Sequence, residues 1–264
     1  MSATDPESPQ FVRLSIENHV GWLEFDRPPV NAFEWVMTRQ VRDALEWFEH
    51  HDDVRVIVMA SALERYFSAG ADLEAFRDIG ESGMGDWCDL VHDIVRRLRS
   101  SGKPVLAAIH GTAVGGGLEM TLHCDIRFAA TNARLGQPEV NIGFIPPVGA
   151  TQALVRLIGR PNTLRYLYDG NLLNAEQART LGLVDEVVET EVLRETVQAY
   201  AETLCAKPPE ALAGIRRAIN QGGGMAFEDG LAVERSVAVS LAGTDNFNEG
   251  VRAFLEKRQP VWAR

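Results

Sequence analysis

The segment Lys103-Pro-Val-Leu-Ala-Ala-Ile-His-Gly-Thr-Ala-Val-Gly-Gly-Gly-Leu-Glu119 contains an apolar run, a glycine-rich turn and the predicted start of a helix. The apolar run is typical of a strand that is covered on both faces. The three consecutive glycines allow the backbone to turn tightly and to approach another group closely. The first N–H groups of a helix that begins here are free to face an anion, and the helix dipole favours negative charge there. The same pattern is also compatible with tight helix–strand packing and a surface glutamate.

Apolar strands and amphipathic helices alternate on both sides of this segment. The first predicted helix spans residues 34–51, where apolar residues recur at steps of three and four. Strands that are separated by helices indicate βαβ units with mainly parallel pairing. We therefore predict an α/β core over residues 11–190. Its predicted strands are a hairpin of residues 11–16 and 21–25, turned at Asn18-His19, and residues 54–60, 104–109, 125–130 and 183–188.

A different pattern follows residue 190, because the apolar strands stop and only helical segments continue. Pro208-Pro209 and three consecutive glycines at 222–224 separate these segments. We predict that residues 191–264 form a C-terminal helical region. Its predicted helices are residues 191–206, 209–221, 227–241 and 245–255.

The composition is that of a soluble protein with an acidic balance. The 264 residues include 26 Lys and Arg against 37 Asp and Glu, which gives a formal charge of −11. This balance argues against nucleic acid as a partner, and no uncharged run is suitable as a membrane span. Three scattered cysteines are too few for a disulfide framework or a zinc site. Residues 1–10 are polar and lack the apolar core of a signal peptide, so we expect them to form a disordered tail and the protein to be cytoplasmic. We also expect no bound metal.

Two further segments carry residues that are suited to catalysis. Small residues fill Phe67-Ser-Ala-Gly-Ala-Asp-Leu73, and the stretch from Gln137 to Pro147 carries Glu139 between apolar residues. Two carboxylates on different segments, together with exposed backbone donors, are what proton transfer beside a developing oxyanion requires. The motifs of a phosphate-binding loop, of a zinc metalloprotease and of a serine hydrolase are absent from the sequence. We interpret His110 as a buried structural histidine and His123-Cys124-Asp125 as a helix end that runs into a strand.

Together, these segments resemble the crotonase superfamily, also called the enoyl-CoA hydratase/isomerase superfamily. The A-G-A-D pattern of the family is present as Ala69 to Asp72. Its K-P-x-x-A-x-x-x-G-x-x-x-G-G-G-x-E pattern runs from Lys103 to Glu119, and its Q-P-E-x-x-x-G-x-x-P pattern runs from Gln137 to Pro146. The resemblance covers nearly everything except the first ten residues and the stretch around residues 78–87.

This resemblance implies the crotonase fold, a right-handed superhelix of ββα units with C-terminal helices that serve oligomerisation. It implies a homotrimer or a dimer of trimers that acts on acyl-CoA thioesters, with coenzyme A as part of the substrate and no separate cofactor. The two backbone N–H groups that hold the thioester oxygen in the family fall at Ala71 and Gly116. Carried over in the same way, Ala69, Asp72 and Lys257 are candidate substrate contacts.

The resemblance further implies a reaction through Glu119 and Glu139, because hydratases of the family carry two glutamates. We expect the hydration of a trans-2-enoyl-CoA, as in fatty acid β-oxidation, with Glu119 activating water and Glu139 supplying the proton at the α-carbon. A close pair of this kind titrates as one coupled unit. Double-bond isomerases of the family generally need only the second glutamate. The alternatives are an isomerase or another enolate reaction, and a non-catalytic acyl-CoA-binding protein.

Two residues depart from the hydratase pattern. Pro147 stands where hydratases usually have a glycine whose N–H helps to hold the attacking water, and proline has no N–H. Water placement would then rely on the two glutamates alone. Glu74 stands where many relatives have a lysine near the adenosine end of coenzyme A. A glutamate there repels phosphate, which leaves Lys257 and Arg258 as the candidate cationic contacts.

Overall fold

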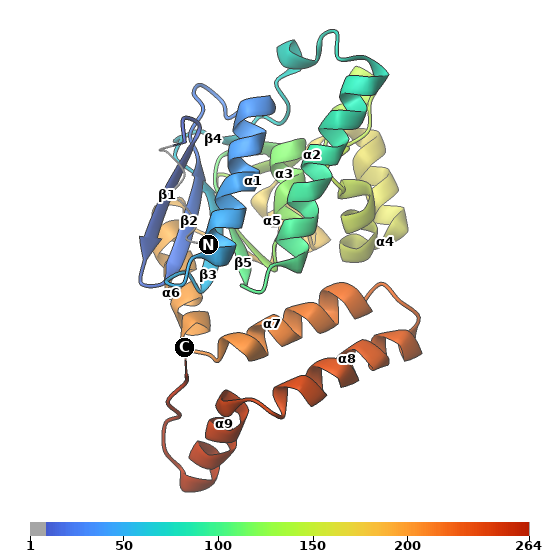
Figure 1. The fold of residues 1–264 in the computed structure, drawn as a ribbon. Coiled ribbons are helices and arrows are strands. Elements are labelled where there is room, and N and C mark those ends of the chain that lie inside the picture. Colours follow the sequence, from blue (N-terminus) through green and yellow to red (C-terminus); the bar gives the residue numbers. More distant parts are fainter. Residues whose placement is uncertain (1–8, 264) are drawn as a thin grey trace.

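The computed structural model describes residues 9–263, so nearly all of the predicted tail at residues 1–10 lies outside the described residues. Two sheets form the framework of the core (Figure 1). The larger sheet has the order β1 (Val12–Glu17), β2 (Val20–Phe25), β3 (Val56–Ser61), β5 (Val105–Ile109), β7 (Ile126–Ala130) and β10 (Glu186–Val188). The smaller sheet has the order β4 (Tyr66–Ser68), β6 (Thr112–Val114), β8 (Arg134–Gly136) and β9 (Leu172–Asn174).

Pairing in the larger sheet is parallel except for the hairpin of β1 and β2. Asn18 and His19 turn this hairpin with φ values of +48° and +68°, as a tight hairpin turn requires. The predicted hairpin, the predicted strands and the mainly parallel pairing are therefore confirmed.

The chain repeats a strand–strand–helix order, with one strand in each sheet. β3 and β4 precede α2 (Gly80–Ser100), and β5 and β6 precede α3 (Gly116–Thr121). β7 and β8 precede the 3-10 helix η2 (Glu139–Ile142) and then α4 (Ala150–Asp169), which is kinked at Gly159. The order agrees with the ββα superhelix that the resemblance implies. The second strand of each unit has only three residues, which is too short for a periodic pattern in the sequence.

Alternate residues of the larger sheet pack into two separate apolar clusters. Ile57 and Met59 face the cluster that contains α2 and α1 (Trp35–His50), the helix predicted at residues 34–51. Val56 and Val58 face the opposite cluster, which contains α6 (Leu193–Cys205). α6 is the first helix after the predicted boundary at residue 191, and its apolar face packs on the sheet of the core.

The helices that do leave the core begin after α6. These are α7 (Pro209–Arg217), a π-helical turn (Ala218–Gly222), α8 (Phe227–Leu241) and α9 (Asp245–Glu256). Figure 1 shows them as an arm beside the α/β core. The buried guanidinium of Arg216 anchors α7, because it pairs with Asp125 at 2.7 Å and donates to the carbonyl oxygens of Leu98 and Ser101.

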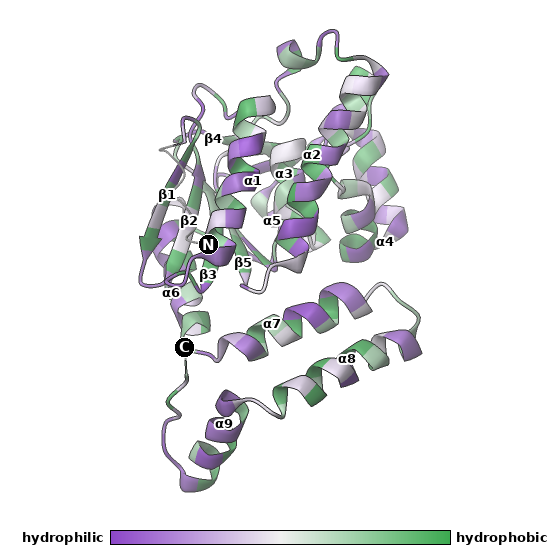
Figure 2. Ribbon diagram, viewed as in Figure 1, coloured by the Kyte–Doolittle hydropathy of each residue, from purple (hydrophilic) through white to green (hydrophobic). Residues whose placement is uncertain are grey.

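Hydrophobic residues are spread along this arm (Figure 2), and the side chains of several are strongly exposed. None of the helices within residues 9–263 combines the length and the apolar character that crossing a membrane requires. Two shorter helices complete the core: α5 (Ala175–Leu181) and the 3-10 helix η3 (Thr190–Val192).

Candidate active site

The three segments that the sequence marked for catalysis line one cavity of about 430 Å³. Glu119 and Glu139 are the only residues with charged side chains among the described residues that line it. The remaining wall is almost wholly apolar. It is formed by Phe33, Ala69, Gly70, Ala71, Leu73, Phe76, Ile79, Met84, Trp87, Val91, Gly115, Gly116, Met120, Pro138, Asn141, Ile142, Phe144, Pro147 and Val148.

The backbone N–H groups of Ala71 and Gly116 lie in the cavity wall and have no acceptor within residues 9–263. Gly116 is the first residue of α3, where an N–H has no partner inside the helix. Ala71 follows β4 and forms an isolated bridge with Phe33, in which the N–H groups of Phe33 and Asp72 make the hydrogen bonds. Both residues line the same cavity, so the structure places the two N–H groups named from the resemblance in one wall.

Close packing of two backbones brings these donors into one wall. Gly70 has a φ of +83°, and a Cβ atom at this position would lie 3.1 Å from the carbonyl oxygen of Val114. A Cβ atom at Gly117 would lie 2.3 Å from the Cβ of Ser68, so α3 fits against β4 only with glycine there. The hydroxyl of buried Ser68 donates to the carbonyl oxygen of Asn31 and accepts from the N–H of Gly70. Gly70 and Gly117 are thus needed because a side chain at either position would prevent this close packing.

Glu119 lies on α3 and is fully buried. Its Oε2 atom accepts hydrogen bonds from the N–H groups of Val148 at 2.7 Å and Ala150 at 3.1 Å. Its Oε1 atom has no hydrogen-bond partner within residues 9–263. Burial and the nearby charge of Glu139 raise the pKa of Glu119 to about 8, although the two backbone hydrogen bonds act in the opposite direction.

Glu139 opens the 3-10 helix η2 and is also buried. A Cβ atom at Gly115 would lie 2.8 Å from its Oε1 atom, so the carboxyl group packs directly on the turn before α3. Burial raises the pKa of Glu139 as well. Gln137 was not assigned a role from the sequence, yet its amide nitrogen, in the orientation that satisfies both groups, donates to both oxygens of Glu139 at 3.2 Å. The sequence feature that could have indicated this role of Gln137 is its position two residues before Glu139.

The candidate substrate contacts from the sequence have different locations. Ala69 lines the cavity. Asp72 does not line it, because its carboxylate pairs with Arg27 at 2.8 Å and accepts from the N–H of Glu74 at the start of the 3-10 helix η1 (Leu73–Phe76). The structure therefore gives Asp72 a part in fixing the loop that carries the Ala71 donor.

The C-terminal cations lie outside the cavity of their own chain. Lys257 directly follows α9, a helix of the arm (Figure 1), and it does not line the cavity. Arg258 pairs with Glu249 at 2.6 Å and also with Glu256. Glu74 is an exposed side chain that pairs with Arg77. The structure therefore does not bring Lys257 or Arg258 to the cavity of the same chain.

Aromatic side chains form the apolar end of the cavity. The ring of Trp87 meets Phe76 edge-on at 4.6 Å between centroids and Trp35 at 5.2 Å. Trp87 belongs to α2, which begins at Gly80 inside the stretch that departs most from the family pattern. Ile79, Met84 and Trp87 from this stretch line the cavity, in agreement with the expectation that the poorly matched residues 78–87 contribute to the acyl pocket.

The remaining signals from the sequence are structural. His110 donates to the carbonyl oxygen of Leu63 at 2.6 Å, although it is half-buried rather than buried. His123-Cys124-Asp125 joins the end of α3 to β7, as predicted. No group of three or more His, Cys, Asp or Glu in the described part of the chain is arranged to hold a metal ion.

Comparisons with known proteins agree with the motifs. The family model for enoyl-CoA hydratase/isomerase matches residues 15–264. The short-chain-enoyl-CoA hydratase of Clostridium acetobutylicum is 32% identical over 249 residues, which cover 94% of this chain and 95% of that protein. The 2,3-dehydroadipyl-CoA hydratase of Escherichia coli K12 is 33% identical over 249 residues, which cover 94% of this chain and 96% of that protein.

Solved structures give the same result for the fold. The crystal structure of an enoyl-CoA hydratase from Bacillus anthracis matches with a TM-score of 0.91 and 30% identity, covering 96% of this chain and 99% of that one. The predicted crotonase fold is therefore confirmed. With the motifs, the fold and these relatives in agreement, the chain belongs to the enoyl-CoA hydratase/isomerase family.

Proposed function

We propose that this protein is an enoyl-CoA hydratase, which adds water across the 2,3 double bond of a trans-2-enoyl-CoA. The observation that carries this proposal is the pairing of two buried carboxyl groups, Glu119 and Glu139, with two free backbone N–H groups in one cavity. Relatives that are named as hydratases of acyl-CoA thioesters support the same reaction. The hydration of such thioesters is a step of fatty acid β-oxidation, which we propose as the setting.

In the proposed reaction, the N–H groups of Ala71 and Gly116 donate to the thioester oxygen. They stabilise the negative charge that gathers there as the enolate forms, and the N-terminus of α3 adds its dipole. These donors are already oriented before the substrate binds, because close backbone packing holds both loops. The apolar wall around them lowers the local dielectric and strengthens their effect.

The two carboxyl groups then move protons. The water oxygen bonds to the β-carbon while Glu119 takes a proton from that water, and Glu139 gives its own proton to the α-carbon. The double-bond electrons pass through the enolate to the new bond between hydrogen and the α-carbon. The pair holds one proton before and after the reaction, and it is ready again once that proton returns from Glu119 to Glu139. The Oε1 atom of Glu119 has no partner within residues 9–263, so it is the oxygen of this carboxyl that remains to accept a hydrogen bond from the attacking water.

The geometry favours hydration over the alternatives. An isomerase needs one carboxyl group to move a proton along the acyl chain, whereas here a second carboxyl group is buried at the same cavity. A protein that only binds acyl-CoA gains nothing from burying two carboxyl groups, because their desolvation costs stability. The N–H groups of Val148 and Ala150, which follow Pro147 in the chain, are used by Glu119, so the attacking water relies on the glutamates.

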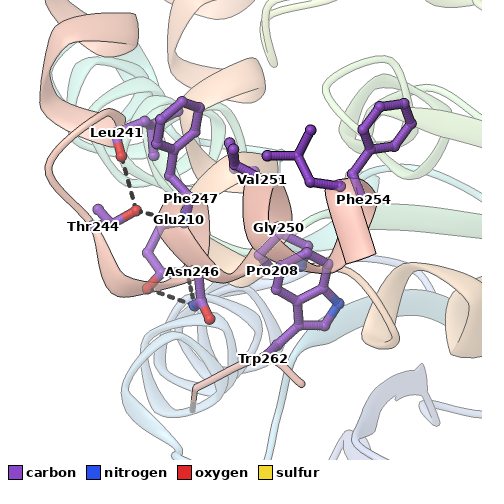
Figure 3. A pocket seen from close by; sticks show the side chains of 12 residues that line it. Pro208, Glu210, Leu241, Thr244, Asn246, Phe247, Gly250, Val251, Phe254 and Trp262 are labelled. Atoms are coloured by element: carbon purple, nitrogen blue, oxygen red, sulfur yellow. Dashed lines mark hydrogen bonds between the residues drawn. The ribbon is translucent and has the colours of Figure 1, made fainter. Parts of the chain in front are cut away.

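We also propose that the C-terminal arm joins copies of this chain, in a homotrimer or a dimer of trimers. Figure 3 shows an apolar groove on the arm, formed between α7, the end of α8, α9 and Trp262. Phe254 and Leu255 at its edge are 84% and 73% exposed. Contiguous exposed apolar side chains mark interaction surfaces. A second copy would cover them and could bring Lys257 to a neighbouring cavity.

The first prediction tests the reaction. Purified protein is mixed with crotonyl-CoA, and the absorbance of the conjugated thioester is followed. We expect Glu119→Gln and Glu139→Gln each to lower kcat by roughly 10²–10⁴, because each removes one proton-transfer group. Glu176→Gln is the matched control, because Glu176 is an exposed residue outside the cavity that pairs with Arg179. This variant should keep the wild-type kcat. A wild-type protein that turns over no enoyl-CoA of any chain length, or full activity in both variants, would contradict the proposal.

The second prediction isolates one backbone donor. Gly116→Pro replaces the N–H at the first position of α3 by a ring carbon, at a position where proline fits a helix well. We expect kcat to fall by roughly 10²–10³, the usual cost of losing one such donor. Gly116→Ala keeps the N–H, and its Cβ would make an ordinary 3.5 Å contact with Val148, so it should retain most of the activity. Equal kcat values for the two variants would exclude Gly116 as a donor.

The third prediction concerns pH. Activity needs one proton on the pair, so kcat/KM for crotonyl-CoA should follow a bell-shaped profile. The pKa of about 8 at Glu119 describes loss of the last proton, because it includes the charge of Glu139. The rate should therefore fall as pH rises above about 8, and it should also fall at acidic pH as the pair gains a second proton. A profile that keeps rising above pH 9 would show that the doubly ionised pair is active.

The fourth prediction concerns assembly. Phe254→Asp places a charge in the exposed apolar groove, so it should lower the mass of the assembly measured by light scattering during gel filtration. Asn248→Asp adds the same charge to an exposed position of α9 outside that groove, and it should leave the mass unchanged. A wild-type protein that runs as a monomer would refute the assembly.

A further inference from the structure

Two histidines contact the turn that holds Glu119. The turn runs from Pro147 to Ala150, between the 3-10 helix η2 and α4. The Nε2 atom of His92, on α2, donates to the carbonyl oxygen of Pro147 at 2.9 Å. The Nε2 atom of His123, just after α3, donates to the carbonyl oxygen of Val148 at 2.9 Å. Neither histidine lines the cavity, so both act from behind the turn.

The same turn supplies the donors of the candidate catalytic carboxyl. The N–H of Val148 donates to Oε2 of Glu119 while the carbonyl oxygen of Val148 accepts from His123. Glu119 and His123 are four residues apart on one segment, and they hold Val148 from its N–H and its C=O. Pro147 has no N–H, so its carbonyl is its one backbone hydrogen-bonding group, and His92 binds it.

The imidazole of His123 also packs directly on the turn. Gly149 has a φ of +89°, and a Cβ atom there would lie 2.8 Å from Nε2 of His123. A side chain at this position would therefore displace the ring. Since the contact is with backbone atoms, a displaced ring would shift the turn and the two N–H groups that it directs at Glu119.

His123 is suited to be a fixed donor rather than a proton carrier. Because Nε2 donates to a carbonyl, Nδ1 carries the lone pair, and it has no partner in the described part of the chain. A proton on Nδ1 would be a buried donor without an acceptor, which is costly. In agreement with this geometry, burial lowers the pKa of His123 to about 4. The side chain thus stays neutral across the range in which the glutamate pair titrates.

We propose that His92 and His123 are positioning residues that hold the Pro147–Ala150 turn so that its N–H groups orient Glu119 and stabilise its ionised form. This proposal rests on the proposed hydration reaction, in which Glu119 takes a proton from water. In this chain, where Pro147 has no N–H to hold the attacking water, the turn would instead serve to orient Glu119. The turn acts on the carboxylate, and the histidines act on the turn.

The sign of the expected pH effect follows from the hydrogen bonds. Donors to the ionised form of Glu119 lower its pKa, so a loosened turn lets the pair hold its last proton more tightly. The basic limb of the pH profile should then move to higher pH. The titratable and charged groups packed around the network are Glu139 on η2, Cys88 and His92 on α2, and Arg99 and Arg127 near His123.

The test compares His123→Leu and His92→Leu with His123→Gln and His92→Gln, because a glutamine amide can restore an N–H near the position of Nε2. We expect kcat for crotonyl-CoA to fall by roughly 10–100-fold in His123→Leu, with KM within about twofold of the wild type, since misplacing a catalytic group costs rate. The half-buried His92 should show a smaller loss of the same kind. In His123→Leu, the basic limb of the kcat/KM profile should move to higher pH by about half a pH unit or more.

His110→Leu is the matched control, because His110 also donates through Nε2 to a loop carbonyl but touches neither the turn nor the cavity. It should keep the wild-type kcat and pH profile, and the glutamine variants should recover most of the loss. Thermal unfolding of each variant shows whether the protein remains folded. If His123→Leu does not fold, the comparison of His92→Leu with His92→Gln decides the outcome.

A readout without turnover separates this proposal from the hydratase proposal. Infrared titration follows the protonated carboxyl band that is missing in Glu119→Gln, and its midpoint should rise in His123→Leu but not in His110→Leu. If the wild type hydrates no enoyl-CoA, the proposed function fails while this midpoint still tests the histidines. Folded histidine variants with wild-type midpoints and pH profiles would overturn the proposal. So would an equal loss of kcat in His110→Leu.

Discussion

The burial of Glu119 is the constraint on which the rest of the site depends. Removing a carboxyl group from water costs roughly several kcal/mol unless hydrogen bonds or protonation compensate. Here two N–H groups from one turn satisfy Oε2, and the high pKa lets the group hold a proton near neutral pH. The same burial that threatens stability therefore creates a carboxyl group that can both take and give a proton.

This constraint explains the glycines around the site. Glu119 reaches the cavity only because α3 begins within it, and α3 begins there only because Gly117 lets it pack on Ser68. Gly115, with a φ of +52°, leaves room for the carboxyl group of Glu139. The glycines that bring the two N–H groups into one wall therefore also bring the two carboxyl groups to the same cavity. In the proposed reaction, the enolate charge and the proton transfers would depend on this single backbone arrangement.

Much of this arrangement could be predicted from the sequence, because it depends on local patterns. The apolar period of α1, the buried strands and the spacing of Glu119 after three glycines are all readable from neighbouring residues. The packing of α6 on the sheet and the remoteness of Lys257 from its own cavity depend on tertiary contacts that no local pattern encodes. His123 was rightly taken as the end of a helix, but its hydrogen bond to Val148, 25 residues away, could be found only in the fold.

The acidic balance of the chain is compatible with an anionic ligand because the proposed site would hold negative charge without cations. None of the described residues that line the cavity is Lys, Arg or His, so the developing oxyanion would meet only neutral N–H groups. Backbone dipoles stay ordered at no cost during the reaction, whereas a mobile lysine would have to be ordered and desolvated first. A lysine beside Glu119 would also lower the pKa of that carboxyl and release the proton that the pair needs. Excluding cations from this cavity is therefore a requirement of the proposed chemistry, and cations for the phosphates of coenzyme A are needed only outside it.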